Sequence, residues 1–336
     1  MSTYRAFEAT SLQDFKLVTR DLRAPSPRQV RVKVEACGIC HTDVFSISGA
    51  SASRPRVPGH EIVGVIDAVG EGVTAWHVGD RVGVGFLGGH CGECERCRRG
   101  DFVNCTDQPQ TGSDVEGGYA EYVYARTSGL VRVPDGMSSI EAAPLLCAGL
   151  TTFNAFPLVN APAGSLVAVQ GIGGLGHLGL QYAAKLGFEV VAIARGTDKA
   201  AQAAALGAHH YVDSTTEDPG EALRKLGGAA AIIATAAHGG SMSALVPGLA
   251  PHGTLVVVGA AADPMSVQTT DLIFGSRTIT GSLTGSSIDN EDNLAFSARQ
   301  GIHPMVETFP WEQAPEAFAH MLSGKARFRV VLEVAA

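Results

Sequence analysis

The sequence predicts an α/β protein in which a β-rich lobe accompanies a doubly wound parallel sheet. Residues 1–148 carry short, valine-rich segments of alternating polarity separated by Gly and Pro turns, which is typical of half-buried strands. From about residue 149 to residue 283, strand-like and helix-like segments alternate, which favours a parallel sheet covered by helices. The chain of 336 residues also exceeds what one hydrophobic core usually covers, so two domains are expected.

The individual elements follow from short segments, taken in chain order. The first lobe should contain strands at QVRVKVEAC, EIVGVIDAVG, DRVGVGF and GYAEYVYA. The parallel sheet should contain strands near SLVAVQ, EVVAIA, HHYVD, AAIIAT, TLVVVGA and RTITGSL. The alanine-rich segment DKAAQAAALGAHH favours a helix between two of them. Residues 284–336 return to mixed strand and helix and finish on FRVVLEV, an apolar alternation that would rejoin the first lobe.

The segment GIGGLG, residues 171–176, lies between an apolar strand and a segment with helical spacing. This context indicates a dinucleotide-binding turn of the Rossmann type. Gly171 would allow the tight turn, Gly173 would let the backbone approach a pyrophosphate, and Gly176 would let the helix pack on the strand. Gly174 belongs to the same turn, where free N–H groups at the helix N-terminus would bind the anion.

Four cysteines at C-x2-C-x2-C-x7-C spacing predict a metal site. They are Cys91, Cys94, Cys97 and Cys105. Thiolates at this spacing suit one tetrahedral zinc, and a closed shell of four thiolates leaves no position for a substrate, so the zinc should be structural. The alternative is a pair of disulfides, which this spacing disfavours in an intracellular chain.

The remaining cysteines, Cys37, Cys40 and Cys147, suggest a second metal site together with His60. Zinc held by Cys40, His60 and Cys147 would keep a fourth position for water or a substrate oxygen, as a catalytic metal needs. Cys37 and Cys40 also form a C-x-x-C, but no strand–helix–strand pattern surrounds them, which argues against a thioredoxin-like redox pair. Cys37 is therefore interpreted as a small buried apolar residue.

Composition excludes several classes of partner. The formal net charge of −8 argues against nucleic acid or an anionic membrane surface. No apolar run approaches the length of a bilayer-spanning helix, and the N-terminal segment has charges where a signal peptide needs an apolar stretch. The expected compartment is the cytoplasm, whose reducing conditions suit thiolate zinc ligands.

The chain resembles a zinc-dependent medium-chain alcohol dehydrogenase over essentially its whole length. The resemblance is carried by CGICHTD, PGHEIVGVIDAVG, VGDRVGVG, HCGECERCRRGDFVNC, GGYAEY, PLLCAGLTT, QGIGGLGHLG and FRVVLEV. It implies a GroES-like catalytic domain over residues 1–148 and 284–336, with two zinc ions, and a Rossmann coenzyme-binding domain over residues 149–283. It also implies an alcohol or aldehyde substrate, a nicotinamide coenzyme and a homodimer or homotetramer.

The resemblance also implies roles for residues near the second metal. Thr42 would bond the substrate oxygen and pass its proton outward, and Asp43 would orient His60. Glu61 would lie beside the metal and ligate it transiently. Further coenzyme contacts are implied for His41 and Arg329 at the pyrophosphate and for Thr151 and Leu175 at the nicotinamide.

Two positions depart from the pattern of many relatives. Phe45 stands where a histidine hands the relay proton to solvent, so the relay would end elsewhere. Arg195 follows the second strand, where an enzyme that uses NAD usually has Asp or Glu. Arg195 with Gly196, Thr197 and Lys199 would hold a 2′-phosphate, which favours NADP(H) over NAD(H). The alternative is that Arg195 only stacks on the adenine.

Phe86 and Leu87 occupy a position that lines the substrate pocket in the family, and with Phe45 they indicate an apolar or aromatic alcohol. Two other functions are left open. A non-catalytic NADP(H)-binding protein of the same fold would be expected to lose the ligands of the second metal, which are present here. A zinc-bearing redox or chaperone-like binding module would not need a complete Rossmann half.

Overall fold

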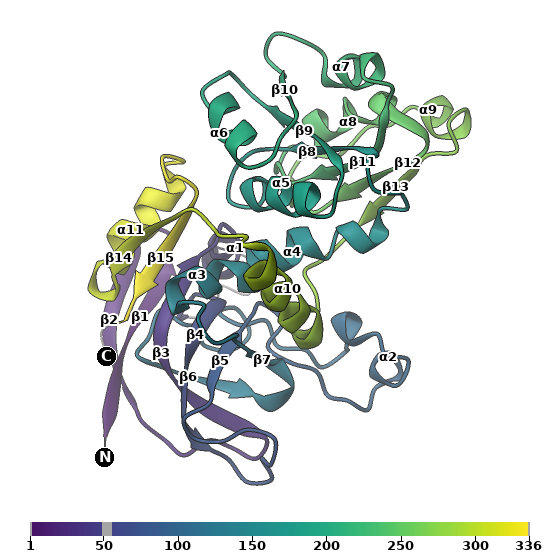
Figure 1. Cartoon of the computed structure of the whole chain (residues 1–336). Coiled ribbons are helices and arrows are strands. Elements are labelled where there is room, and N and C mark those ends of the chain that lie inside the picture. The colour runs from purple at the N-terminus through teal and green to yellow at the C-terminus, as the bar shows by residue number, and fades with distance from the viewer. Residues whose placement is uncertain (1, 49–55, 335–336) are drawn as a thin grey trace. The chain divides into compact units, whose positions relative to one another are not determined.

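The computed structural model describes residues 2–48 and 56–334 of the chain. The chain divides into two compact units (Figure 1). The first consists of Met1–Leu150 and Thr284–Ala336, and the second of Thr151–Leu283. Among the helices that are described, none combines the length and the apolar character that crossing a bilayer requires.

The first unit is built on a mainly antiparallel sheet of strand order β14-β15-β3-β4-β5-β7, with β6 paired to β3 and β1 paired to β2 in a separate ribbon. The strands are β1 (Thr3–Ser11), β2 (Asp14–Asp21), β3 (Gln29–Ile39), β4 (Glu61–Val69), β5 (Arg81–Val84), β6 (Tyr122–Arg126), β7 (Leu130–Arg132), β14 (Val306–Pro310) and β15 (Arg329–Glu333). Buried and less buried positions alternate along the first part of β3, which is why its valines read as a strand in the sequence.

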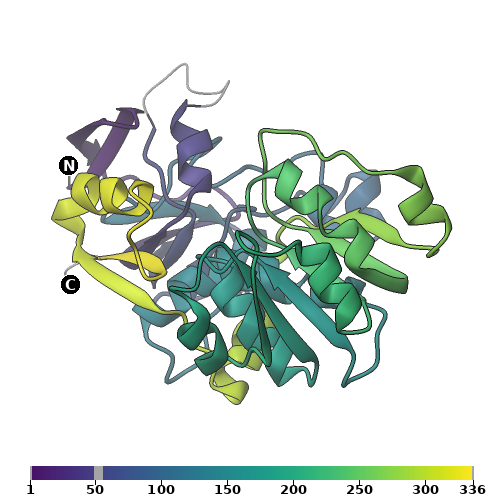
Figure 2. The ribbon, with the colours of Figure 1, turned by 90° about the horizontal axis from the view of Figure 1, so that it is seen from above.

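The C-terminal strand β15 closes this sheet. It pairs antiparallel with β3, from Val330 opposite Ile39 to Glu333 opposite Ala36. In Figure 2 the yellow C-terminal elements accordingly lie beside the purple N-terminal ones. The prediction that FRVVLEV rejoins the first lobe is confirmed.

Helices and turns of the first unit connect these strands. They are α1 (Thr42–Ser48), α2 (Glu95–Arg98), η1 (Phe102–Asn104), η2 (Thr127–Gly129), α3 (Ser139–Pro144), the π-helix η3 (Leu145–Gly149), α10 (Ser287–Gln300), η6 (Trp311–Gln313) and α11 (Ala314–Leu322). Both α3 and α10 begin with a capping box, in which Ser138 or Ser286 accepts a backbone N–H three residues on. The core of the unit contains Trp311, Tyr119 and Phe318, all almost fully buried, so segments far apart in the sequence share one apolar interior.

The second unit is a parallel sheet of order β10-β9-β8-β11-β12-β13. Its strands are β8 (Leu166–Gln170), β9 (Glu189–Ala194), β10 (His210–Asp213), β11 (Ala229–Ala234), β12 (Leu249–Val257) and β13 (Thr278–Gly281). Its helices and turns are η4 (Phe156–Leu158), α5 (Gly176–Lys185), α6 (Ala200–Ala205), α7 (Pro219–Lys225), α8 (Gly239–Ser243), η5 (Val246–Gly248) and α9 (Thr269–Ile273), while α4 (Leu150–Phe153) spans the boundary between the units.

This strand order makes the second unit a doubly wound Rossmann sheet, as predicted. Each strand expected from the sequence is present, and Figure 1 shows α5 to α9 gathered around the sheet. The order reverses between β8 and β11, the point at which such sheets bind ligands beyond the carboxyl ends of their strands. The glycine turn at Gly171 follows β8 directly and therefore lies at that point.

Candidate active site and metal centres

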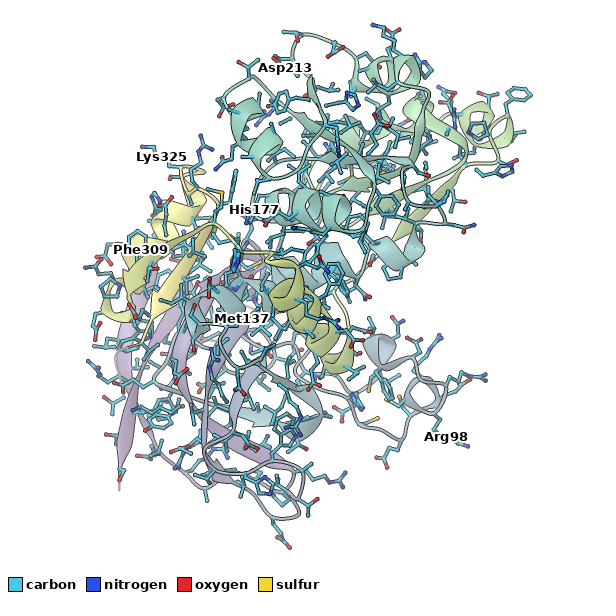
Figure 3. The ribbon with its side chains drawn as sticks, viewed as in Figure 1. Arg98, Met137, His177, Asp213, Phe309 and Lys325 are labelled. Atoms are coloured by element: carbon cyan, nitrogen blue, oxygen red, sulfur yellow. The ribbon has the colours of Figure 1, made fainter. Side chains whose placement is uncertain are left out.

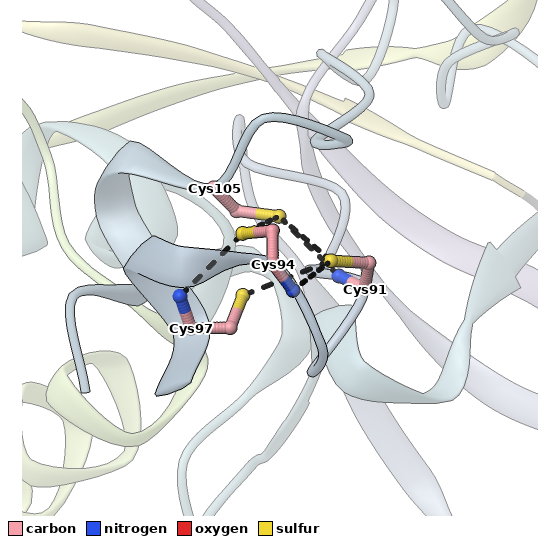
Figure 4. Close-up of side chains that lie close together, drawn as sticks. All are labelled: Cys91, Cys94, Cys97 and Cys105. Carbon is pink, nitrogen blue, oxygen red and sulfur yellow. Dashed lines mark hydrogen bonds between the residues drawn. The ribbon is translucent and has the colours of Figure 1, made fainter. Parts of the chain in front are cut away.

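The four-cysteine lobe brings its thiols together around one point (Figure 4). The Sγ atoms of Cys91 and Cys97 lie 3.9 Å apart, those of Cys94 and Cys105 3.9 Å, and those of Cys105 and Cys91 3.6 Å. None of the chain's seven cysteines, all within the described residues, forms a disulfide. Bonds of 2.3 Å to a tetrahedral zinc would separate the sulfurs by about 3.8 Å, so the cluster fits that ion.

Backbone geometry prepares the sulfur of Cys94 to be a thiolate. Cys94 caps the N-terminus of α2, and its sulfur accepts the N–H of Cys97 at 3.5 Å. Hydrogen bonds from the backbone of Cys97 and Thr106 lower the pKa of the Cys94 thiol to about 5. The N–H of Cys94 in turn donates to the sulfur of Cys91 at 3.4 Å. N–H groups directed at sulfur stabilise the charged form that binds a metal.

A second cluster forms at the end of β3 and the start of β4. Ligand atoms of Cys40, His60, Glu61 and Cys147 all lie within 4.8 Å of one another. The sulfurs of Cys40 and Cys147 are 4.0 Å apart, and the exposed fractions of Cys40, His60 and Cys147 are 5%, 0% and 9%. The pKa of Cys40 is well below its ordinary value because the Cys147 thiol donates to its sulfur, which outweighs burial.

His60 is oriented by a buried carboxylate. Its Nδ1 lies 2.9 Å from Oδ1 of Asp43, and both side chains are fully buried. Apart from the sulfur of Cys40, no group among the described residues bonds to the other ring nitrogen, Nε2. A buried nitrogen of this kind needs a partner, and a metal between it and the two sulfurs would supply one. The residues of this cluster therefore fit a zinc held by Cys40, His60 and Cys147.

The carboxylate of Asp43 is itself held in place. Its Oδ2 accepts the N–H of Cys40 at 3.1 Å and the hydroxyl of Tyr119 at 3.1 Å, and its Oδ1 accepts the N–H of Gly59 at 3.3 Å. With His60 these donors use both carboxylate oxygens. Asp43 thus lies beside His60, and its role in orienting a zinc ligand stays a prediction.

Glu61 is paired with Arg329 on β15. Nη2 of Arg329 donates to Glu61 Oε1 at 2.5 Å and to the carbonyl of Ile39 at 3.1 Å. Burial raises the pKa of Glu61 to about 7, although the charge of Arg329 opposes the increase. Gly38 makes room for this carboxylate, since a Cβ there would lie 1.9 Å from Oε2. Arg329 thus forms a buried ion pair with Glu61. Its contact with a pyrophosphate stays a prediction.

The second unit contains a cavity of about 1060 Å³ at the carboxyl ends of its strands. It is lined by the glycine turn and the loop after β9, including Gly171, Gly173, Gly174, Leu175, Arg195, Gly196 and Lys199. Gly171 has φ of +90°, which L side chains rarely adopt, whereas a Cβ on Gly173 would meet no heavy atom within 4 Å. The backbone at Gly173 is thus open to a ligand.

Asp213, labelled in Figure 3, lies at the end of β10 and holds the loop after β9 by hydrogen bonds. Oδ1 of Asp213 accepts the N–H of Gly196 at 2.8 Å and the hydroxyl of Thr215 at 2.7 Å. Tyr211 donates its hydroxyl to the carbonyl of Gly196 at 2.8 Å. Arg195 is exposed, and Asp198 also lines the cavity. The loop thus offers a cationic side chain on a fixed backbone.

Two family models match the chain: the alcohol dehydrogenase GroES-like domain over residues 26–135 and the zinc-binding dehydrogenase over residues 174–299. Alcohol dehydrogenase notN of Aspergillus sp. (strain MF297-2) is 45% identical over 312 residues, which cover 93% of this chain and 92% of that protein. The chain belongs to the zinc-dependent medium-chain alcohol dehydrogenase family.

Two solved structures agree with this assignment. Cinnamyl alcohol dehydrogenase SbCAD4 from Sorghum bicolor is 31% identical with a TM-score of 0.89, and the match covers 99% of this chain and 98% of that one. A CAD from Helicobacter pylori, solved in complex with NADP(H), is 28% identical with a TM-score of 0.87, and the match covers 98% of each chain.

The other predicted site residues of this alcohol dehydrogenase lie in several places. Thr42 begins α1, with its N–H 3.5 Å from the sulfur of Cys40. The ring of Phe86 packs edge-on against His60, with 5.3 Å between centroids, and Leu87 beside it is buried. Phe45 is 54% exposed. His41 is exposed and Thr151 is buried in the second unit. Their roles toward substrate and coenzyme stay predictions.

Sequence reasoning missed several residues of these sites. His177 is buried in α5, and its Nδ1 bonds to the carbonyl of Gly173 at 3.0 Å, so it stiffens the glycine turn. Its spacing of four residues from that glycine was the available signal. Tyr119, which bonds Asp43, and two asparagines of α10, Asn290 and Asn293, had no such signal, because their partners are distant in the sequence.

Proposed function

We propose that this alcohol dehydrogenase interconverts an alcohol with an aldehyde or ketone at a zinc held by Cys40, His60 and Cys147. The convergence of these three side chains, with His60 Nε2 directed at no other partner among the described residues, carries the proposal. The four-cysteine lobe is proposed to hold a second, structural zinc, because its shell of thiolates is closed.

When bound, zinc would supply a Lewis acid toward the substrate oxygen, and a nicotinamide would exchange the hydride. Asp43 keeps the proton of His60 on Nδ1, which leaves the lone pair of Nε2 for the metal. Thr42 stands two residues after Cys40, and its hydroxyl is proposed to accept the proton of the substrate hydroxyl. Glu61 is proposed to ligate the metal transiently through Oε2, which has no hydrogen-bond partner among the described residues, while Oε1 stays paired with Arg329.

The coenzyme is proposed to lie in the cavity of the second unit, with NADP(H) preferred over NAD(H). Arg195 occupies the place where a carboxylate would bind the ribose hydroxyls of NAD and repel a 2′-phosphate. Lys199 lines the same cavity, and the solved CAD of Helicobacter pylori binds NADP(H). Each hydrogen bond from a charged donor to the 2′-phosphate would contribute about 1.5–3 kcal/mol.

A primary or aromatic alcohol or aldehyde is proposed as the substrate, because Phe45, Phe86 and Leu87 would present an apolar wall.

We also propose a homodimer or homotetramer, since β13 ends its sheet with an edge that is unpaired among the described residues, and Ile273 and Phe274 beside it are 69% and 87% exposed. The cytoplasm is the proposed compartment, because thiolate ligands suit a reducing environment.

Initial rates with primary aliphatic, benzylic and cinnamylic alcohols and aldehydes, each with both coenzymes, test the function. Cys147→Ala should lose turnover and one zinc per chain while coenzyme still binds. Cys37→Ala is the matched control, because it removes a buried thiol outside the ligand set. Wild-type turnover in Cys147→Ala would refute the assignment of the metal.

The coenzyme preference has its own test. Arg195→Asp should shift the ratio of kcat/KM for the two coenzymes toward NAD(H) by roughly 10- to 100-fold or more, and Arg195→Ala should fall between it and the wild type. A preference that does not depend on residue 195 would leave Arg195 as an adenine-stacking group.

A further inference from the structure

Cys147 stands on an unusual piece of backbone. The residues Leu145–Gly149 form a π-helix between α3 and α4, and the N–H of Leu150 donates to the carbonyl of Leu145, five residues back. Pro144 comes immediately before it and has no N–H to donate. A π-turn inserts one residue into the helical register and is rare, so contacts from outside the helix would help to hold it.

Two buried amides of α10 supply such contacts. Nδ2 of Asn293 donates to the carbonyl of Leu145 at 2.9 Å, and Nδ2 of Asn290 donates to the carbonyl of Leu146 at 3.0 Å. The two asparagines are also joined, since Asn293 Nδ2 lies 3.4 Å from Asn290 Oδ1. Asn290 is 2% exposed and Asn293 is 0% exposed.

The bond to Leu146 acts directly on the metal ligand. The carbonyl of Leu146 and the nitrogen of Cys147 belong to one peptide plane, which is rigid. A hydrogen bond to that carbonyl therefore restricts rotation of the plane from which the side chain of Cys147 projects. The bond from Asn293 restricts the preceding plane in the same way.

The residues around the π-turn leave little room for movement. A Cβ on Gly85, just after β5, would lie 3.1 Å from the carbonyl oxygen of Leu146 and 3.4 Å from Nδ2 of Asn290. A Cβ on Gly83 would lie 2.7 Å from the side chain of Leu146. The turn thus packs against β5 and Gly85 and is bonded by the two amides. Burying amides here carries a desolvation cost that only well-formed hydrogen bonds offset.

We propose that Asn290 and Asn293 are positioning residues, which fix the π-turn so that the sulfur of Cys147 stays within metal-binding distance of Cys40 and His60. This proposal rests on the proposed function, because it assumes that Cys147 is a zinc ligand. Neither asparagine is itself a ligand, and both act through backbone carbonyls.

The test compares the zinc-loaded wild type with the variants Asn290→Leu and Asn293→Leu, which roughly keep the side-chain volume but remove the hydrogen-bond donor. If a leucine variant does not fold, the alanine variant at the same position replaces it. Ser287→Ala is the matched control. Ser287 lies on the same helix and donates to the carbonyl of Ser128 at 2.7 Å, away from the π-turn.

The readouts are the rate of zinc release to a chelator, the thiolate-to-metal charge-transfer band after cobalt substitution, and the melting temperature. We expect the asparagine variants to release one zinc per chain at least about 10-fold faster than the wild type and to show a shifted cobalt band. Ser287→Ala should release zinc at the wild-type rate even where it melts at a similarly lowered temperature.

The proposal would be overturned if the variants at Asn290 and at Asn293 both released zinc at the wild-type rate and both showed the wild-type cobalt band. Cys147→Ala separates this result from a failure of the proposed function. If that variant retains the same zinc content as the wild type, Cys147 is no ligand, and the proposed function and the positioning role both fall. If it loses one zinc while the asparagine variants behave as the wild type, only the positioning role falls.

Discussion

Replacing Gly173 with alanine should weaken coenzyme binding and leave the fold intact. A Cβ at this position would meet no heavy atom of the protein within 4 Å, and the backbone is not in the positive-φ range. Because alanine also restricts the unfolded chain, the free energy of unfolding should stay level or rise by up to about 1 kcal/mol. The added methyl group instead points into space that lies along the coenzyme cavity.

Gly176→Ala, three residues further on, should have the opposite effect. Its Cβ would lie 1.8 Å from the carbonyl oxygen of Gly171 and 2.8 Å from the carbonyl carbon. That oxygen also accepts the hydroxyl of Thr235 at 2.7 Å, so it is not free to move away. Separating α5 from the turn should lower the free energy of unfolding by about 1–3 kcal/mol or more.

Urea unfolding and coenzyme titration on both variants distinguish the two effects. We expect Gly173→Ala to unfold like the wild type and to bind coenzyme at least about tenfold more weakly, a loss of roughly 1.4 kcal/mol. Gly176→Ala should unfold at a lower urea concentration. Wild-type affinity in Gly173→Ala would show that the backbone at this glycine does not approach the coenzyme.

Three further predictions concern residues that hold the sites. Cys105→Ser should lower the melting temperature by about 5 °C or more while activity per folded molecule is kept, and unchanged melting would contradict a structural metal. Tyr119→Phe removes the hydroxyl that bonds the buried carboxylate of Asp43 and should lower the free energy of unfolding by about 1.5–3 kcal/mol. Tyr4→Phe is the control, because the Tyr4 hydroxyl makes only a 3.5 Å contact. Equal losses in the two variants would show that the bond from Tyr119 to Asp43 adds no stability. Hydrogen bonds from Thr215 and Gly196 lower the pKa of Asp213, so its stabilising effect is present above pH 3.8 and is lost as pH falls through the lowered pKa. In urea unfolding, Asp213→Asn should therefore be less stable than the wild type above pH 3.8 and equally stable below the lowered pKa. A stability difference that does not depend on pH would contradict this prediction.

Local patterns in the sequence predicted most of the fold. The strands of the Rossmann sheet were predictable because each is a short apolar run followed by a helical segment, and parallel strands are buried on both faces. The glycine turn was predictable because Gly176 meets the backbone of Gly171, five residues earlier, which any side chain would strike. These constraints act between residues close together in the chain.

The supports of the metal cluster depend on distant pairings and were not predictable in this way. Asn290 looks like an ordinary polar residue of a helix, and only the packing of α10 on the π-turn reveals its bond to Leu146. The contact of Arg329 with a pyrophosphate stays a prediction, but the bond of its guanidinium to Glu61, more than two hundred residues earlier, had no signal in the sequence. A single sequence contains no record of which distant side chains meet.

The first unit is made from both ends of the chain, which has a consequence for synthesis. During translation Cys40, His60 and Cys147 leave the ribosome before α10 and β15 exist, whereas the second unit is continuous in sequence and is complete earlier. The strand β15 that completes the sheet beside β3, and the asparagines that hold the π-turn, therefore arrive last. A ribosome-bound chain can thus have a finished Rossmann fold while its proposed metal ligands still lack their supports, so the proposed metal site should mature only after β15 has left the ribosome.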